Sequence, residues 1–541
     1  MLQFLYTIAG LLVATDAQYL NLPLERTTEY ATSLSKRQAV NTTLTLANQG
    51  ASYVANISFG TPGQIVQLIL DTGSPLTWVN AANLSTYTPG SSPTSAQQAQ
   101  GRTICQSYSC LNPASSSTLT VPSNTTIFDI QYVDGTSSIG RIVEDTATFQ
   151  GLTDTTFQFG LVEYFYSPNG VGAALGGILG LSPPNRVISY ASLPSALAAT
   201  SNTAVTSAFT PQTILQQLRD AGAISSTAFS LYLSDGSTGQ LTIGGVDSGR
   251  YSGPLTVLPI QSDPTSTGTD FYVNLAATGH GGTASNRITV NQLVVLDSGT
   301  TSIYIPATVV EQLAQDLQGY FVPYDSSSGL LAIPCSTSTT IDFYFSDSAV
   351  IRVPTSEILQ GRLTASQARR LGITTSSDVC VLSLFGTVDS DVYLLGDAFL
   401  RSAYVVYDLD QGQIALAQSS YNTGSNITTI GSGLYGIPEG VYNTSSPGAS
   451  NVAAVPSATR TVTLASNPVP RSTLGGSGTL TFTVSGTTGI TRAGTGTTTG
   501  TGAPAAASTR ATSSADRGHI FTHGPVLLAG LCAFMVGVLF S

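Results

Sequence analysis

The stretch "LILDTGSPLTWV", residues 68–79, runs from an apolar strand pattern into an aspartate and then directly into Thr-Gly-Ser. The same arrangement returns as "LVVLDSGTTSIYI", residues 293–305. One such motif is typical of a turn that ends a strand. Two of them, at Asp71 and Asp297, indicate two related halves, and an internal duplication of this kind builds a molecule with pseudo-twofold symmetry. Counterparts meet near the axis, so Asp71 is expected to face Asp297.

The composition narrows the chemistry to carboxylates. The chain has 541 residues, of which only 9% are charged, with a net charge of −11. No basic face is available for nucleic acid, and an acidic chain repels itself least at low pH. The three histidines are His280, His519 and His523, and no His or Cys spacing typical of zinc occurs. We therefore expect no metal and no cofactor.

The two ends predict secretion and anchoring. Residues 1–17 form an apolar segment ending in a small-residue cleavage pattern, typical of a signal peptide. Residues 516–541 give a polar spacer and an uncharged tail. A membrane span is one interpretation, but no basic residue follows the tail. The small residues before it favour a GPI-attachment signal that is removed, with Ser514 or Ser513 as the attachment residue.

Residues 18–37 read as a pro-segment that ends in the dibasic pair Lys36-Arg37, and Lys36 is the only lysine in the chain. A kexin-like protease would cut after Arg37 and leave Gln38 as the new N-terminus. The alternative is an accidental dibasic pair on a flexible arm.

If the chain is secreted, N-linked glycans and disulfide bonds can also be predicted from the sequence. Six asparagines begin N-x-Ser/Thr sequons: Asn41, Asn56, Asn83, Asn124, Asn426 and Asn443. Of the five cysteines, Cys105 and Cys110 form the natural local bridge and Cys335 and Cys380 the long one. Cys532 is left over in the tail.

The chain between residues 52 and 420 reads as many short strands separated by Gly, Pro, Asp and Ser clusters, so the fold class is mainly β. The clearest helical patterns are "PQTILQQLRDAG" and "PATVVEQLAQDLQG". After about residue 421 the chain becomes rich in Ser, Thr, Gly and Ala, and such a segment cannot bury enough apolar surface to form a core. We expect an N-terminal lobe at 38–247, a C-terminal lobe at 248–422 and an O-glycosylated stalk at 423–515.

With these features the chain resembles a pepsin-type aspartic protease of the fungal, GPI-anchored, yapsin-like kind. "DTGSPLTW" resembles the first active-site loop, with Trp78, and "FDIQYVDGTSSIG" the flap hairpin, with Tyr132. "GGILGLSP" and "YLLGDAFLRSAYVVYD" resemble the paired segments behind each active-site loop, with Gly180 and Gly396. The resemblance implies a bilobal fold of two pseudo-twofold-related β lobes with an active-site cleft between them.

The resemblance implies catalysis by Asp71 and Asp297. Two carboxyl groups about 3 Å apart cannot both ionise cheaply, so they share one proton; pepsin itself is a known example of this coupling. The ionised member activates water and the other polarises the peptide carbonyl. Around them the family pattern assigns support to the loop residues Thr72, Gly73, Ser74, Ser298, Gly299 and Thr300, and substrate contact to Trp78 and Tyr132.

Asp134 carries a specificity hypothesis. It lies two residues after Tyr132, where fungal enzymes that accept lysine before the scissile bond also carry an aspartate; the alternative is a turn residue favoured in Asp-Gly. Two polar insertions, at 80–105 and 185–211, are either rims of the cleft or glycosylated surface.

Three functions compete. The first is a monomeric endopeptidase that works at acidic pH on the outer face of the cell, cutting proteins or peptides after large apolar and also basic residues. The second is a surface protein that kept the fold without catalysis, and the third is a stalked adhesin. Both aspartates keep their glycines, which favours the enzyme; an adhesin would not explain two matched carboxylate loops.

Overall fold

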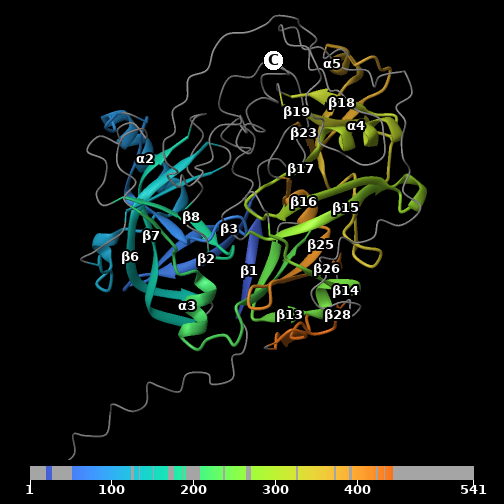
Figure 1. The fold of residues 1–541 in the computed structure, drawn as a ribbon. Coiled ribbons are helices and arrows are strands. Elements are labelled where there is room, and N and C mark those ends of the chain that lie inside the picture. Colours follow the sequence, from blue (N-terminus) through green and yellow to red (C-terminus); the bar gives the residue numbers. More distant parts are fainter. Residues whose placement is uncertain are drawn as a thin grey trace, which may run out of the picture.

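The computed structural model describes residues 20–26 and 52–442, apart from gaps at 90, 123–126, 133–134, 150–151, 168–175, 185–186, 191–206, 235–237, 263–269, 325–326, 371–372, 389–392, 422–423 and 432. The fold is mainly β, as predicted. Most strands belong to two sheets, one of 16 strands and one of 10. Figure 1 shows the early strands gathered on one side and the later strands on the other. The molecule is therefore bilobal.

The N-terminal lobe is built from strands, with two helices on its outside (Figure 1). Its elements are β2 (Tyr53–Phe59), β3 (Gln64–Asp71), β4 (Trp78–Thr86), α2 (Ser95–Tyr108), β5 (Ile127–Gln131), β6 (Ser137–Phe149), β7 (Leu152–Tyr166), β8 (Gly177–Gly180), β9 (Val187–Tyr190), β10 (Ser207–Phe209) and α3 (Ile214–Asp220).

The C-terminal lobe holds the 10-stranded sheet. Its elements are β15 (Tyr272–His280), β16 (Ile288–Leu296), β17 (Ile303–Pro306), α4 (Ala307–Asp316), β18 (Tyr320–Pro323), β19 (Ser328–Pro334), β20 (Thr340–Tyr344), β21 (Val350–Pro354), β22 (Leu359–Leu363), α5 (Ala365–Arg370), β23 (Val379–Thr387), β24 (Tyr393–Leu395) and α6 (Asp397–Leu400).

Strands at the base complete the larger sheet and bring the two halves of the chain together. They are β1 (Leu20–Arg26), β11 (Ala228–Leu233), β12 (Thr238–Ile243), β14 (Tyr251–Pro259), β25 (Ala403–Asp408), β26 (Gln413–Ser419) and β28 (Gly440–Tyr442), while β13 (Gly245–Asp247) pairs with β27 (Ile427–Thr429). Strand β1 lies between β2 and β12. The expected pro-segment, 18–37, thus contributes a strand to this sheet.

The two halves repeat one pairing pattern, as the duplicated motif predicts. In the first half β3 pairs parallel with β8, β8 pairs antiparallel with β4, and β4 pairs parallel with β7. In the second half β16, β24, β17 and β23 pair in the same order and with the same directions. The strands that lead to the two aspartates, β3 and β16, therefore have equivalent neighbours in the two halves.

Glycine is needed where the paired segments pass behind the active-site loops. A Cβ on Gly180 would lie 2.7 Å from the backbone of Leu76, and one on Gly396 would lie 2.2 Å from the carbonyl oxygen of Thr300. Either side chain would push its active-site loop out of place.

The folded part extends beyond the boundary expected at residue 422. Ile430 and Ile437 are buried beside β14 and β25, so residues 424–431 and 433–442 belong to the lobe and not to the stalk. The buried carboxylate of Asp247 holds this segment, accepting from the backbone N–H of Asn426 at 2.7 Å and the hydroxyl of Ser425 at 2.7 Å. The sequence hid this because the glycines at 424, 431, 433, 436 and 440 interrupt the apolar residues, so that no continuous strand or helix pattern appears.

Both insertions contain regular structure. The first forms helix α2, which opens with a capping box between Thr94 and Gln97. This helix was not predicted from the sequence, although the Thr-x-x-Gln pattern is a capping-box signal that could have indicated it. The second supplies β9 and β10, and β9 pairs with β5. In the part of the chain described, no helix is long and apolar enough to cross a membrane.

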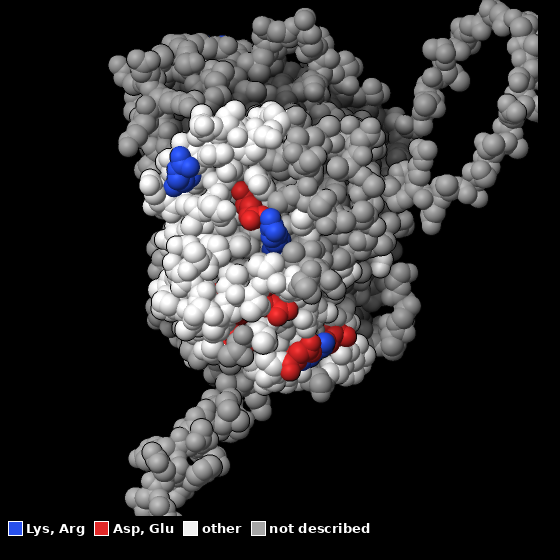
Figure 2. Space-filling model, turned by 90° about the vertical axis from the view of Figure 1, so that its left-hand side faces the viewer, with Lys and Arg blue, Asp and Glu red and all other residues white. Residues whose placement is uncertain are grey.

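The predicted helices are present and slightly shorter than their patterns. Helix α3 begins after Thr213, whose side chain forms a capping box with Gln216. Helix α4 begins directly after Pro306. The face of the molecule in Figure 2 carries only a few scattered charged side chains, which agrees with the low charge content.

Candidate active site

Each predicted catalytic aspartate stands where a strand meets a turn. Asp71 ends β3, and its carboxylate accepts from the N–H of Gly73 at 2.8 Å and from the hydroxyl of Ser74. Asp297 follows β16 and accepts from the N–H of Gly299 at 2.8 Å and the hydroxyl of Thr300 at 2.6 Å. In each half the same two donors, at two and three residues further on, fix the carboxylate.

The two carboxyl groups face each other. A Cβ on Gly73 would lie 2.8 Å from Oδ1 of Asp297, and a Cβ on Gly299 would lie 2.5 Å from Oδ1 of Asp71. Each glycine thus makes room for the carboxylate of the opposite half. The structure therefore brings Asp71 and Asp297 together, as the repeated motif predicts.

Burial controls the protonation of this pair. Asp71 is 5% exposed and Asp297 is 8% exposed. Burial, and then the neighbouring charge of Asp297, raise the pKa of Asp71 to about 7. Burial also raises the pKa of Asp297, against the opposing hydrogen bonds from Thr300 and Gly299. Two buried carboxyl groups this close cannot both ionise cheaply, so they titrate as a coupled pair that holds one proton between its two pKa values.

The loops that carry the pair interlock through four hydrogen bonds. The hydroxyl of Thr72 donates to the carbonyl of Leu296 at 2.8 Å and accepts from the N–H of Ser298 at 2.9 Å. The hydroxyl of Ser298 donates to the carbonyl of Leu70 at 3.1 Å and accepts from the N–H of Thr72 at 3.2 Å. Both side chains are buried. The serine at 298 keeps this symmetry because only its hydroxyl is used.

We expect Thr72→Val to lower the free energy of unfolding by about 2 kcal/mol, because it leaves the buried N–H of Ser298 without its acceptor and removes a donor from the carbonyl of Leu296. Thr72→Ser is the matched control, since it keeps the hydroxyl and removes only a methyl group. Urea unfolding measures both variants. Equal losses for valine and serine would show that packing, and not the interlock, stabilises the loops.

The predicted flap residues also meet. Tyr132 follows β5, and its hydroxyl accepts from the indole N–H of Trp78 at 2.7 Å. Trp78 is fully buried at the start of β4. The hairpin turn is closed by a hydrogen bond from the N–H of Gly135 to the carbonyl of Tyr132. Gly135 has a φ of +80°, a backbone conformation that favours glycine. Asp134 lies outside the described residues.

Both disulfides are formed as paired from the sequence. Cys105–Cys110 has an S–S distance of 2.04 Å at the end of α2, and Cys335–Cys380 has one of 2.08 Å and joins the end of β19 to β23.

Three of the six sequon asparagines are described, and all three are exposed: Asn56, Asn83 and Asn426. The others (Asn41, Asn124 and Asn443) and the attachment candidates Ser513 and Ser514 lie outside the described residues, as does the Lys36-Arg37 pair.

Tyr407 is a supporting residue that the sequence did not reveal. It is fully buried in β25, and its hydroxyl donates to the carbonyl of Leu296 at 3.3 Å, one residue before Asp297. Its ring stacks on Phe229 with centroids 4.6 Å apart. Burial raises its pKa, so it stays a neutral donor. Only the tertiary packing of β25 under the second loop shows this role.

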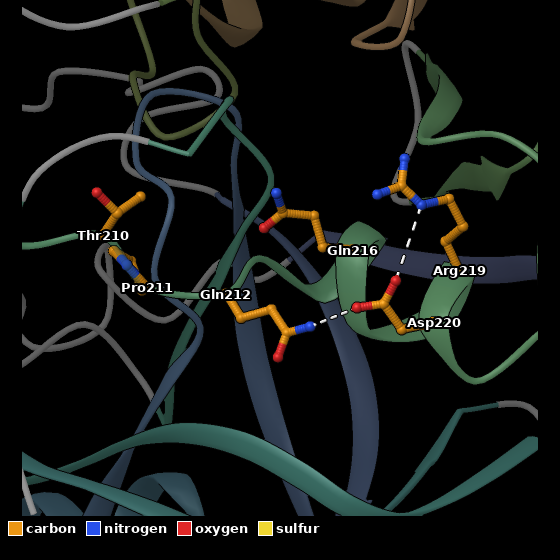
Figure 3. A pocket seen from close by; sticks show the side chains of 6 residues that line it. All are labelled: Thr210, Pro211, Gln212, Gln216, Arg219 and Asp220. Carbon is orange, nitrogen blue, oxygen red and sulfur yellow. Dashed lines mark hydrogen bonds and ion pairs between the residues drawn. The ribbon is translucent and has the colours of Figure 1, made fainter.

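A polar hollow of about 280 Å³ lies at α3, apart from the carboxyl pair (Figure 3). Inside it the amide of Gln212 donates to the carboxylate of Asp220 at 2.7 Å, and Arg219 forms an ion pair with Asp410 at 3.1 Å. Its charged groups are thus already paired. It is lined by Thr210, Pro211, Gln212, Gln216, Arg219 and Asp220.

A mainly β fold of two related halves, each giving one carboxyl group to a buried pair, defines the pepsin-like class of protein. The family profile "Eukaryotic aspartyl protease" matches residues 52–419. The probable aspartic-type endopeptidase opsB of Aspergillus oryzae is 33% identical over 421 residues, which cover 75% of this chain and 77% of that protein. Secreted aspartic protease 3 of Candida albicans is 34% identical over 401 residues, 73% of this chain and 86% of that protein.

A crystal structure of an aspartic proteinase from Irpex lacteus has a TM-score of 0.49 and 19% sequence identity, over 75% of this chain and 98% of that chain. On the family match and these sequence relatives, the chain belongs to the eukaryotic aspartyl protease family, a family of aspartic-type endopeptidases.

Proposed function

We propose that Asp71 and Asp297 are the catalytic pair of an endopeptidase that hydrolyses peptide bonds at acidic pH. The observation that carries this proposal is the facing of two buried carboxyl groups, each fixed by equivalent donors from its own loop. No other pair of described carboxyl groups has this twofold setting.

In the proposed reaction the ionised carboxyl group takes a proton from a water molecule as the water attacks the peptide carbonyl carbon. The protonated carboxyl group gives its proton to the carbonyl oxygen, so a neutral gem-diol forms. The carboxyl group that took the proton from water then gives it to the amide nitrogen, while the other carboxyl group takes a proton from a hydroxyl of the gem-diol. The C–N bond breaks, the acid and amine products leave, and the pair is again singly protonated in its starting form. Acid–base help of this type typically gives about 10²–10⁴-fold.

The surrounding residues keep this chemistry possible. Ser74 and Thr300 donate to the outer oxygens and hold the carboxyl groups in place, which limits their reorganisation during the reaction. Tyr132, held by Trp78, would cover the bound peptide and exclude water. Because Asp134 follows Tyr132 by two residues, we propose that the enzyme accepts Lys or Arg before the scissile bond as well as large apolar residues.

We further propose that the enzyme is secreted as a monomer, cut after Arg37 by a kexin-like protease and held by a GPI anchor at Ser514 or Ser513, on the plasma membrane or the cell wall. The apolar residues 1–17, the uncharged tail and the Ser/Thr-rich stalk support this location. The name of a Candida albicans relative, secreted aspartic protease 3, agrees with secretion.

The test is cleavage of a peptide library from pH 3 to pH 8, with and without pepstatin, by the wild type and by Asp297→Asn. We expect cleavage on the acidic side that falls as the pH rises through about 7, where the pair loses its shared proton. Pepstatin and Asp297→Asn should each abolish it. Cleavage that ignores both would belong to another protein, and a set of cleaved peptides without basic residues before the cut would remove the role of Asp134.

A further inference from the structure

Strand β4 is hydrogen-bonded to the flap hairpin at both of its ends. At its start, Trp78 donates to Tyr132, as described above. Just after its end, the hydroxyl of Tyr87 donates to the hydroxyl of Ser137 at 3.1 Å. Ser137 is the first residue of β6, the second strand of the hairpin. The second link has no part in the chemistry proposed above.

The link from Tyr87 continues across the hairpin. The hydroxyl of Ser137 donates to the carboxylate of Asp129 in β5 at 2.8 Å. The three residues form a directed chain, Tyr87 to Ser137 to Asp129, which ends on an acceptor. All three are buried, with 7%, 5% and 3% exposed. Breaking a hydrogen bond between buried groups costs free energy, because water cannot reach these groups to replace the lost partner.

Packing and pairing hold the same place from two further sides. The ring of Tyr87 lies 5.7 Å from that of Tyr166, and both contact a small apolar cluster with Ile127 and Ile139 from the two flap strands. On its outer edge β5 pairs with β9, which matches Asp129 with Ile188. Asp129, the last acceptor of this hydrogen-bond chain, therefore lies in β5, which is paired on both sides, with β6 and with β9.

We propose that Tyr87 and Asp129 are positioning residues for catalysis, which fix the flap hairpin against β4 through Ser137 and so keep Tyr132 at Trp78. This rests on the proposed function, in which the flap covers the peptide. A hairpin held in place before substrate arrives loses little freedom on binding. Loosening it should weaken substrate binding and leave the chemical step at the carboxyl pair nearly unchanged.

The test compares Tyr87→Phe, Ser137→Ala and their double variant with the wild type. Tyr87→Phe breaks one buried hydrogen bond and should raise KM by about 3- to 10-fold. Ser137→Ala breaks both bonds of the chain and should raise KM by at least as much. In both variants kcat should change by less than about twofold. Amide hydrogen exchange at 127–131 and 137–139 should become faster. Because both substitutions break one chain, the double variant should lose little more than the worse single one.

Tyr166→Phe is the matched control, since it removes a hydroxyl from the same aromatic cluster outside the chain; its KM and exchange rates should match the wild type. The proposal is overturned if Tyr87→Phe leaves KM and exchange unchanged, if the two effects add fully, or if only thermal stability falls. Hydrogen exchange does not depend on catalysis, so a wild type without peptidase activity would remove the proposed function and leave this measurement decisive for the flap.

Discussion

Gly299→Ala is expected to lower kcat by about 100-fold or more. The added Cβ would lie 2.5 Å from Oδ1 and 2.9 Å from Cγ of Asp71, closer than real Cβ atoms approach such atoms. The carboxyl group of Asp71 must therefore move away from that of Asp297. Misplacing a reacting group by about 1 Å is enough for a loss of about 10²-fold. Steady-state kinetics on a quenched peptide at pH 4 measures the change.

The matched control for this variant is Gly361→Ala, because a Cβ at Gly361 in β22 meets nothing within 4 Å. It should keep the wild-type kcat. Gly299 itself does not have a positive φ, so alanine there fits the backbone and the fold should persist. A kcat within about threefold of the wild type for Gly299→Ala would mean that the facing of the two carboxyl groups does not limit the reaction.

The facing pair was predictable because the motif occurs twice and symmetry relates the copies. The sequence patterns around Asp71 and Asp297 also predicted their donors, since Thr-Gly-Ser and Ser-Gly-Thr offer the same groups at the same spacing. The mainly β fold followed from the density of short strand patterns. These features depend on short stretches of sequence, or on the repetition of one short stretch in the second half.

What could not be predicted depends on tertiary contacts. Tyr407 supports the second loop from β25, more than 100 residues later in the chain. The sequence places residues 424–431 and 433–442 in the stalk, and they fold because Asp247 accepts a hydrogen bond from Asn426 and because Ile430 and Ile437 join an apolar cluster. Strand β9 comes from an insertion without a clear strand pattern, and it pairs because β5 presents an edge to it. Partners of this kind become visible only in the folded chain.

Raising the pH from 4 to 7.5 is expected to lower the free energy of unfolding by about 4 kcal/mol or more, since each raised pKa unit contributes about 1.4 kcal/mol. Burial and the neighbouring Asp297 raise the pKa of Asp71 to about 7, and burial raises the pKa of Asp408 to about 6, both from 3.8. The folded state therefore binds these protons more tightly than the unfolded state does. This contribution is complete below about pH 3.8 and is lost as the pH rises through the folded-state values.

Two other carboxyl groups act in the opposite direction. Burial is the largest single influence on the pKa of Asp247 and of Asp410 and would raise both. The hydrogen bonds to each group together outweigh it and lower both pKa values; the largest come from Asn426 to Asp247 and from Thr227 to Asp410. Their contribution is present above about pH 3.8 and is lost as the pH falls below it. The two sets together place maximum stability near pH 4 to 5, on the acidic side where the carboxyl pair holds its proton.

Urea unfolding between pH 3 and pH 7.5 measures this dependence. Asp297→Asn should flatten the fall between pH 4 and pH 7.5, because the remaining carboxyl group no longer has a charged neighbour, and it should make the protein more stable than the wild type at pH 7.5. Asp408→Asn should remove the part of the fall centred near pH 6 and keep the part that belongs to the pair. A wild-type stability that stays level or rises over this range would contradict the burial of both groups, and with it the reason that one proton stays between Asp71 and Asp297.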